Sequence, residues 1–193
     1  MTSEMRESWM VLRAQGGDRE AFDALLAAVQ EPLFGFVAAV TGDRTLAEDV
    51  LQEVFVRIWS GLRWLRDPAL FRPWAYRIAA REAVRHARRE RRRDALHDDA
   101  ALDALPAADA EPPDPWLLER LPRLLDRVSP ASRAVLTLHY LHELSLAETA
   151  AVLGISAGTA KSRLAYGLRT LRDALGLTAS ASSDERSTTR EEP

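Results

Sequence analysis

A proline-rich, acidic segment divides this chain of 193 residues into two parts. Residues 94–115 carry seven acidic side chains and no Lys or Arg. Within them the run Glu111-Pro-Pro-Asp-Pro cannot be helical, because proline lacks an amide donor and restricts the residue before it. We therefore predict two folded units, residues 1–93 and 116–177, joined by a flexible acidic linker. Residues 178–193 are small, polar and without periodicity, and they are predicted to form a disordered tail.

Both folded units are predicted to be helical. Glycine is scarce while Ala, Leu and Arg are abundant, which favours helix over strand. Apolar residues recur with helical spacing, and they predict a short leading helix followed by four helical stretches over Phe22–Val29, Leu33–Val40, Thr45–Leu62 and Pro73–Arg93. The expected fold class is all-α, with two small helical domains: an N-terminal helical domain and a C-terminal helix-turn-helix domain.

Three sites carry helix-start signals. Thr45 with Glu48, and Ser145 with Glu148, have the spacing of a capping box, in which each side chain satisfies the other residue's backbone amide. Ser129-Pro130 has the pattern of an N-cap followed by proline in the first turn. These signals predict where three of the helices begin.

Several classes of protein are excluded by what the sequence lacks. It has no cysteine, which excludes disulfides and thiolate metal sites. The longest apolar run, Leu33–Val40, is too short to cross a bilayer, and the first ten residues have no signal-peptide core. We therefore expect a cytoplasmic protein without membrane insertion.

Nor does the sequence indicate an enzyme. The four histidines, His86, His97, His139 and His142, show no metal-ligand pattern, and His139 and His142 are expected to lie one near the core and one at the surface. No phosphate-binding glycine loop or nucleophile elbow is present. We expect no catalytic residue, no metal, no cofactor and no small-molecule substrate.

The net charge of −3 conceals a strongly basic segment. Residues 71–93 hold nine Arg and only two Glu. Guanidinium groups at every fourth position suit a phosphate backbone, since their binding releases condensed counterions; a solvated charged face is the alternative. The arginines of this spacing and their neighbours are Arg77, Arg81, Arg85, Arg88, Arg89, Arg92 and Arg93.

Aromatic residues precede this basic helix and could hold unstacked bases. Trp59 lies on an apolar helical stripe, so we predict core packing for it, and Trp74 is similar. Trp64 falls in a loop, and it is the candidate for DNA contact.

The second unit contains the pattern of a helix-turn-helix. Ala150 provides a small residue where two helices cross, and Gly154 can take the positive φ of the turn. Ser156 can cap the second helix, whose exposed first turns would reach base edges in the major groove. The residues predicted to reach the duplex are Ser156, Lys161, Ser162, Arg163 and Tyr166, while Arg169 and Arg163 suit phosphate. An ordinary helical hairpin is the alternative.

These segments, in this order, resemble the extracytoplasmic-function (ECF) subfamily of bacterial RNA polymerase sigma factors. The resemblance spans about residues 11–176. The motifs that carry it are Gly17-Asp-Arg-Glu-Ala-Phe, Thr41-Gly-Asp, Ala47-Glu-Asp-Val-Leu-Gln-Glu-Val-Phe, Phe71-Arg-Pro-Trp-Ala-Tyr-Arg-Ile-Ala, Leu136-Thr-Leu-His-Tyr, Glu148-Thr-Ala-Ala-Val-Leu-Gly-Ile-Ser and Gly158-Thr-Ala-Lys-Ser-Arg-Leu.

The resemblance implies a subunit that directs RNA polymerase core to promoter DNA. Its first domain would bind the polymerase clamp coiled coil through Asp49, Gln52 and Glu53, whose alternative is a solvated helix face. The loop Gly61–Leu70 would capture a flipped minus-ten base, and the second domain would read the minus-thirty-five element and contact the flap. The linker would thread towards the RNA exit path, and an anti-sigma factor is an expected partner. The implied minus-ten residues are Trp64, Arg77, Arg81, Arg85, Arg88 and Arg89.

The sequence departs from the family pattern at three places. Arg81 and Arg85 stand where the family often has Asn and Asp, residues 165–168 replace further arginines, and Ala160 replaces a larger β-branched residue. A stand-alone helix-turn-helix regulator is the rival interpretation, but it explains only residues 116–176.

Overall fold

The computed structural model describes residues 2–94 and 124–175, and every regular element in these two ranges is helical. The all-α prediction and the two helical domains are therefore confirmed. Apart from Asp94, the predicted linker lies outside the described residues, as does the predicted tail.

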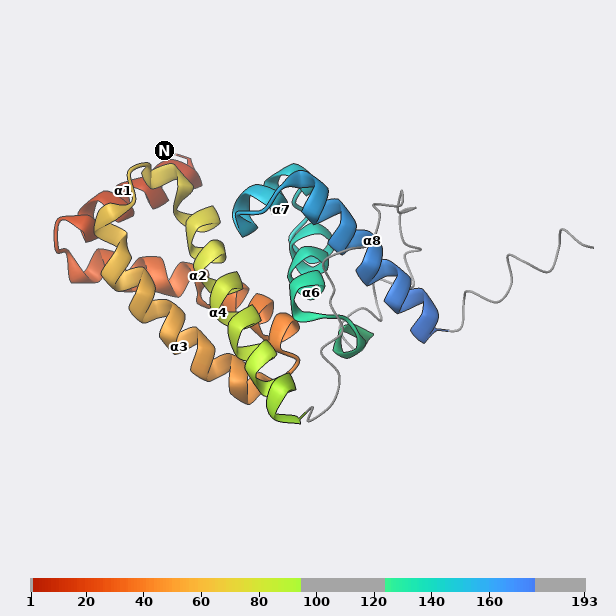
Figure 1. Ribbon diagram of the computed structural model, residues 1–193. Helices are drawn as coiled ribbons and strands as arrows, with labels where there is room; N and C mark the ends of the chain where they lie inside the picture. The colour runs from red at the N-terminus through yellow and green to blue at the C-terminus, as the bar shows by residue number, and fades with distance from the viewer. Residues whose placement is uncertain (1, 95–123, 176–193) are drawn as a thin grey trace, which may run out of the picture.

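Over residues 2–94 the first domain consists of four α-helices and a short connecting loop (Figure 1). Two 3-10 turns, η1 and η2, form the loop between α3 and α4. Buried apolar residues of α2, α3 and α4 form the core, and α1 packs on α2. The bounds are α1 (Ser3–Gln15), α2 (Arg19–Thr41), α3 (Arg44–Gly61), η1 (Leu62–Trp64), η2 (Pro68–Leu70) and α4 (Phe71–Asp94).

One helix, α2, replaces the two stretches predicted over residues 22–29 and 33–40. It continues through Pro32 although proline removes one helical hydrogen bond. The reason is tertiary: Leu25, Val29, Leu33 and Phe36 keep one phase and are all buried in the same core. α2 is also long and apolar enough to cross a membrane by length and composition, a test that a core helix passes as well.

The start of α3 differs from the predicted capping box. The N-cap is Asp43, whose carboxylate accepts a hydrogen bond from the Leu46 amide at 3.0 Å, so that Thr45 already lies within the first turn. Asp43 follows Gly42, which has a φ of 78° and ends α2. The tight turn between the two helices thus selects a cap two residues earlier than the sequence pattern indicated.

The second domain is a small helical unit that contains the predicted helix-turn-helix. Gly154 has a φ of 65° in the turn, and Ser156 caps α8 through the Thr159 amide at 3.0 Å. The capping box of Ser145 with Glu148 is confirmed, as is the Ser129 N-cap. The bounds are η3 (Leu125–Arg127), α6 (Pro130–Leu136), the π-helical segment η4 (Thr137–Leu141), α7 (Leu146–Leu153) and α8 (Ala157–Ala174).

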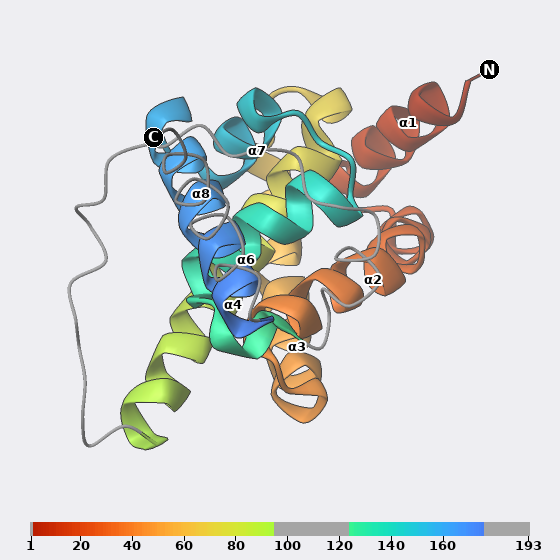
Figure 2. The ribbon, with the colours of Figure 1, turned by 90° about the vertical axis from the view of Figure 1, so that its right-hand side faces the viewer.

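The two domains pack directly against each other. Helices α6 and α7 lie beside α4, and α6 also contacts α2 (Figures 1 and 2). Ala134, Leu138 and Val152 of the second domain are buried in the same apolar cluster as the core of the first. A second cluster, which includes Leu136 and Leu168, forms the core of the second domain itself.

Candidate nucleic-acid and polymerase interfaces

The arginines of α4 do not share one face. Ala75, Ala79 and Ala83 are fully buried and fix the side of α4 that packs on the first domain. Arg81, together with Arg88 and Arg89, is exposed to solvent. An α-helix turns 100° per residue, so positions four apart drift by about 40° and the series from residue 77 to 89 sweeps about 120°.

Arg77 faces the second domain. Its Nη2 donates to the carbonyl oxygen of Ala151 at 2.6 Å, and its Nε donates to that of Val152 at 3.2 Å. Both carbonyls belong to the last turn of α7, where helical hydrogen bonding leaves acceptors unsatisfied. In this arrangement Arg77 caps a helix of the neighbouring domain.

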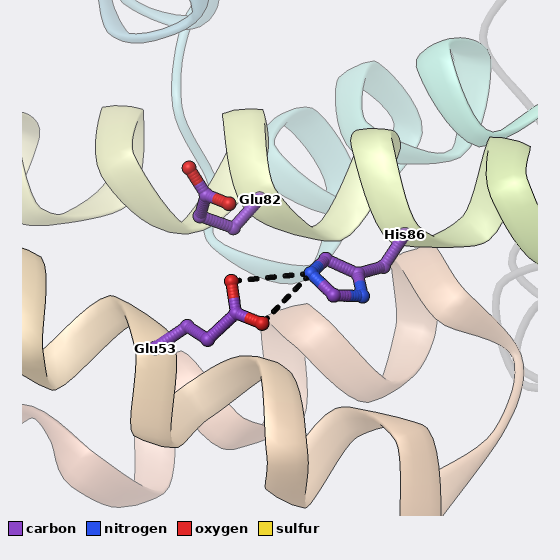
Figure 3. A group of neighbouring side chains, drawn as sticks. All are labelled: Glu53, Glu82 and His86. Atoms are coloured by element: carbon purple, nitrogen blue, oxygen red, sulfur yellow. Dashed lines mark hydrogen bonds and ion pairs between the residues drawn. The ribbon is translucent and has the colours of Figure 1, made fainter.

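Arg85 faces α3, where it lies between two carboxylates. Its Nη2 donates to Glu53 at 2.7 Å and also to the buried Glu82, which accepts a further bond from Arg57 Nε at 2.9 Å. His86 Nε2 lies 3.2 Å from Glu53 (Figure 3). Burial raises the pKa of Glu53, but the hydrogen bond and charge of His86 and the charges of nearby arginines outweigh it, so this pKa lies below its ordinary value.

Among the described residues, Glu53, Glu82 and His86 are also a set that could supply metal ligands, with their ligand atoms within 4.8 Å of one another. Imidazole and carboxylate together suit several divalent transition metals. However, Arg57 and Arg85 already supply two positive charges to these carboxylates. The group is best described as an ion-pair network that fastens α3 to α4.

The three residues predicted to contact the polymerase clamp do not all face the same way. Gln52 lines an open groove of about 1100 Å³ between α2 and α3, and Glu48, one turn earlier, lines it too. Glu53 instead belongs to the network with α4, and the exposed Asp49 lies one turn before it. Glu48 was missed, although its spacing of four residues from Gln52 places both on one helix face.

Trp64 is exposed on a loop whose backbone is held in place. Its side chain is 73% exposed, with the Arg63 guanidinium 4.9 Å from the ring centre. Gln15 of α1 donates from Nε2 to the carbonyl oxygens of Leu62 and Leu65, at 2.9 and 2.8 Å. Sequence reasoning missed Gln15, because nothing local links it to a loop 50 residues away.

Trp59 and Trp74, for which core packing was predicted, differ in their burial. Trp59 is 55% exposed, so the prediction of core packing was wrong, although its ring meets Phe22 edge-on at 4.5 Å. It lies in the last turn of α3. Trp74 is partly buried against Gly61, where an added Cβ would come 3.0 Å from the indole.

The predicted recognition residues lie on the first three turns of α8. Ser156 is exposed, and its hydroxyl is used in the cap and in a contact with the Thr159 hydroxyl at 2.8 Å. Ser162 donates to the Thr159 carbonyl at 3.0 Å, and Lys161 and Arg163 beside it are half-buried. Tyr166 is half-buried, with the Arg169 guanidinium 5.6 Å from its ring centre.

The two histidines of the second domain are both half-buried, so the expected division into one core and one surface residue was wrong. His139 Nδ1 lies 2.6 Å from the Leu144 carbonyl oxygen. His142 Nδ1 lies 3.1 Å from the Tyr76 hydroxyl of the first domain. Both are anchored by structural contacts.

Comparison with known proteins matches both halves of the chain to one family. Residues 25–93 match Sigma-70 region 2, and residues 118–171 match Sigma-70 region 4. The chain is 33% identical over 169 residues to the RNA polymerase sigma factor CarQ of Myxococcus xanthus, covering 85% of this chain and 94% of that protein. It is 29% identical over 180 residues to the ECF RNA polymerase sigma-E factor of Escherichia coli K12, with coverages of 85% and 91%.

Two solved structures share the fold. CnrH, in complex with the cytosolic domain of CnrY, superposes with a TM-score of 0.63 at 24% identity and covers 90% of this chain and 99% of that chain. RpoE of Bartonella quintana, in complex with the anti-sigma factor NepR, gives a TM-score of 0.58 at 21% identity, with coverages of 81% and 98%. The order of the two regions, the helix-turn-helix geometry and the similarity to CarQ together lead to one conclusion: this chain belongs to the ECF subfamily of RNA polymerase sigma factors.

Proposed function

We propose that this chain binds RNA polymerase core and directs it to promoters with a minus-ten and a minus-thirty-five element. The observation that carries this proposal is the pairing, in one chain, of an arginine-bearing helix in a Sigma-70 region 2 unit with a capped helix-turn-helix in a region 4 unit. A stand-alone helix-turn-helix regulator would not need the first of these units. The units extend over residues 1–93 and 116–177.

Contacts with the minus-ten element would come from α4 and from the loop before it. Exposed Arg81, Arg88 and Arg89 would bind phosphates, and Trp64 would stack on an unpaired base. Arg85 would act indirectly, because Glu53 and Glu82 already neutralise it. Arg77 would join the DNA contact only when it leaves α7.

Contacts with the minus-thirty-five element would come from the N-terminal turns of α8. Ser156 and the partly exposed Lys161 and Ser162 would face base edges, with Arg163 and Tyr166 meeting the backbone. Gly154 supports this because its φ of 65° ends α7 and allows the tight turn into α8 that a helix-turn-helix requires.

The polymerase clamp would bind the α2–α3 side of the first domain. The groove offers Gln52 and Glu48 as polar contacts beside Phe34 and Phe55. Asp49 would extend this surface, and Glu53 would support it by holding α4. The protein would act in the cytoplasm, without catalysis of its own, and an anti-sigma factor would restrain it.

Run-off transcription with purified protein, bacterial core polymerase and fragmented genomic DNA tests this function. Discrete transcripts that need both proteins are expected. Lys161→Ala combined with Arg163→Ala should weaken these transcripts while core binding persists, and Arg127→Ala, at an exposed arginine in η3, serves as the control. Sequence-specific binding to duplex DNA by the protein alone, without any association with core, would instead establish the stand-alone regulator.

A further inference from the structure

The loop that carries Trp64 is held by the first helix of the chain. Helix α1 lies beside both 3-10 turns of this loop, η1 and η2 (Figure 1). It also lies outside residues 25–93, the part of the chain that matches Sigma-70 region 2. What α1 does for the loop is therefore to be inferred from its own contacts.

The main polar contact comes from Gln15, the last residue of α1. Its Nε2 donates to the carbonyl oxygen of Leu62 at 2.9 Å and to that of Leu65 at 2.8 Å. A side-chain amide nitrogen carries two hydrogens, so these two bonds use both of them. The Leu62 oxygen also accepts a bond from the Leu65 amide at 3.0 Å. Gln15 thus ties together the two ends of the segment that contains Arg63 and Trp64.

Gln15 is itself fixed in position by its neighbours. Val11 and Ala14 are buried in the core of the first domain, and they set the rotation of α1. After the helix, Arg13 Nε donates to Asp18 at 2.8 Å, and Asp18 is the N-cap of α2. The amide of Gln15 is therefore held by a packed helix with a fixed end.

Glu7 makes a second contact at the far end of the loop. Nε and Nη2 of Arg72 both lie 2.7 Å from Glu7 Oε2. Arg72 is the second residue of α4, which begins directly after η2. Glu7 and Gln15 are eight residues apart, about 12 Å along a helix. Helix α1 therefore spans the loop and holds it at both ends.

The loop is fixed in a form that leaves its tryptophan outside. The Trp64 side chain is 73% exposed, and the Arg63 guanidinium lies 4.9 Å from its ring centre. The hydrophobic effect favours burial of an indole, so a loop that served stability alone would gain by covering it. A backbone fixed on both sides of an exposed ring instead presents that ring to a partner, and an unpaired base is such a partner.

We propose that Gln15 is a positioning residue for minus-ten recognition, because it fixes the backbone around Trp64 so that the indole meets the unpaired base in one orientation. The proposal rests on the proposed function of this loop. A group that is ordered before binding loses less conformational freedom on binding, and a site on a loop is only as precise as the residues that support it. Loss of both bonds should lower the selectivity for the unpaired base about two- to tenfold, although Gln15 does not touch DNA.

Gln15→Glu is the sharpest variant. It keeps the shape of the side chain, but an ionised carboxylate has no hydrogen to donate and sets an oxygen against the carbonyls of Leu62 and Leu65. Ala24→Glu adds the same charge at an exposed position of α2 and is the matched control. If Gln15→Glu loses its helical circular dichroism, Gln15→Ala, which removes the bonds without adding a charge, replaces it.

Fluorine NMR of the free protein, labelled with fluorotryptophan, tests the hold on the loop without polymerase. The Trp64 resonance is identified by its absence from Trp64→Phe. Gln15→Glu should shift and broaden this resonance, and Ala24→Glu should leave it as in the wild type. An unchanged Trp64 resonance in a folded Gln15→Glu protein would overturn the proposal.

Run-off transcription with core polymerase, from promoters that differ in one base, tests the role in recognition. Gln15→Glu should weaken the preference for the native base at the minus-ten position where Trp64→Ala also weakens it, and should leave preferences in the minus-thirty-five element unchanged. The double variant should be no less selective than Trp64→Ala alone, since Gln15 acts through Trp64. Equal losses at both elements, or a further loss in the double variant, would show a merely structural role and overturn the proposal.

The two measurements separate this proposal from the proposed function. If the wild type initiates at promoters and Gln15→Glu keeps full selectivity, the sigma-factor function stands and the positioning role is overturned. If the Trp64 resonance responds as expected but the wild type with core gives no promoter-specific transcripts, the sigma-factor function fails. The role of Gln15 in recognition then fails with it, while the hold of α1 on the loop stands.

Discussion

The Tyr76 hydroxyl and His142 Nδ1 meet at 3.1 Å across the boundary between the two domains. The imidazole is half-buried, and burial lowers the pKa of His142 below its ordinary value of 6.5. Its neutral form is thus the one that fits beside Tyr76 and Phe36.

This contact predicts a dependence of stability on pH. Below pH 6.5 the unfolded chain binds a proton that the folded His142 resists, so the contribution is present above that pH and is lost as the pH falls towards the folded value. Between about pH 7.5 and about pH 5.5 the free energy of unfolding of the wild type should fall more than that of His142→Phe. Urea titrations at several pH values measure it, and parallel slopes would contradict it.

The ion-pair network between α3 and α4, whose acidic members are drawn in Figure 3, predicts that the buried Glu82 makes a large contribution to stability. Glu82→Gln would leave Arg57 and Arg85 without their shared carboxylate. Because both arginines are partly exposed, we expect a loss of about 2 kcal/mol in the free energy of unfolding, below the range for fully buried pairs. Glu48→Gln, on the exposed side of α3, is the control and should change it by less than about 0.5 kcal/mol. Equal effects would show that the network is not stabilising.

Two helical glycines predict opposite results for the same substitution. At Gly167 an added Cβ would come 2.8 Å from Leu136 Cδ1, so Gly167→Ala should destabilise by about 1 to 3 kcal/mol. At Gly35 in α2 nothing lies within 4 Å, so Gly35→Ala should stabilise by about 0.5 to 1 kcal/mol. Thermal unfolding of both variants compares them, and a Gly167→Ala protein as stable as the wild type would refute the packing of α6 on α8.

Trp64 and Trp59 are both exposed, but we expect their substitutions to affect different properties, promoter opening and stability. Trp64→Ala should leave the unfolding temperature unchanged and reduce open-complex formation at least about fivefold, because base stacking contributes about 1 to 3 kcal/mol. Trp59→Ala should do the reverse, since its ring packs on Phe22. Permanganate footprinting and thermal scans report the two properties. Normal opening by Trp64→Ala would remove it from the minus-ten interface.

The N-cap of α3 predicts different losses of stability for substitutions at Asp43 and at Thr45. Asp43→Ala should cost about 1 kcal/mol, whereas Thr45→Ala should cost a few tenths, because only Asp43 accepts from the Leu46 amide. Denaturant unfolding of both variants measures the difference. A larger loss for Thr45→Ala would favour the capping box predicted from sequence.

The helix-turn-helix was predictable because its signals are local. Ser145, Gly154 and Ser156 each act within four residues of their own position, and all three were placed correctly. The continuity of α2 through Pro32 was not predictable, since it depends on packing against other helices. Likewise Glu53 and Gln52 are neighbours in sequence, yet α4 captures only Glu53.

The direction in which each arginine of α4 points also could not be predicted from the sequence pattern. A spacing of four residues suggested that the arginines form one ridge. Because positions four apart rotate around the helix axis, Arg77 instead contacts α7 and Arg85 contacts α3. The side that faces a neighbour is decided by which elements pack there. The charge pattern could identify the helix but not the assignment of its members.

Three arginines that cross the domain boundary, Arg77, Arg91 and Arg133, donate to main-chain oxygens of the other domain, and this affects how the boundary tolerates sequence change. Any amino acid supplies a carbonyl, so no substitution at residues 151, 152, 126, 128 or 40 deletes an acceptor. The donors, in contrast, are three individual side chains. Sequence change at the acceptor positions therefore leaves these bonds intact unless it also alters packing, whereas loss of Arg77, Arg91 or Arg133 removes bonds that the substituted side chain cannot replace.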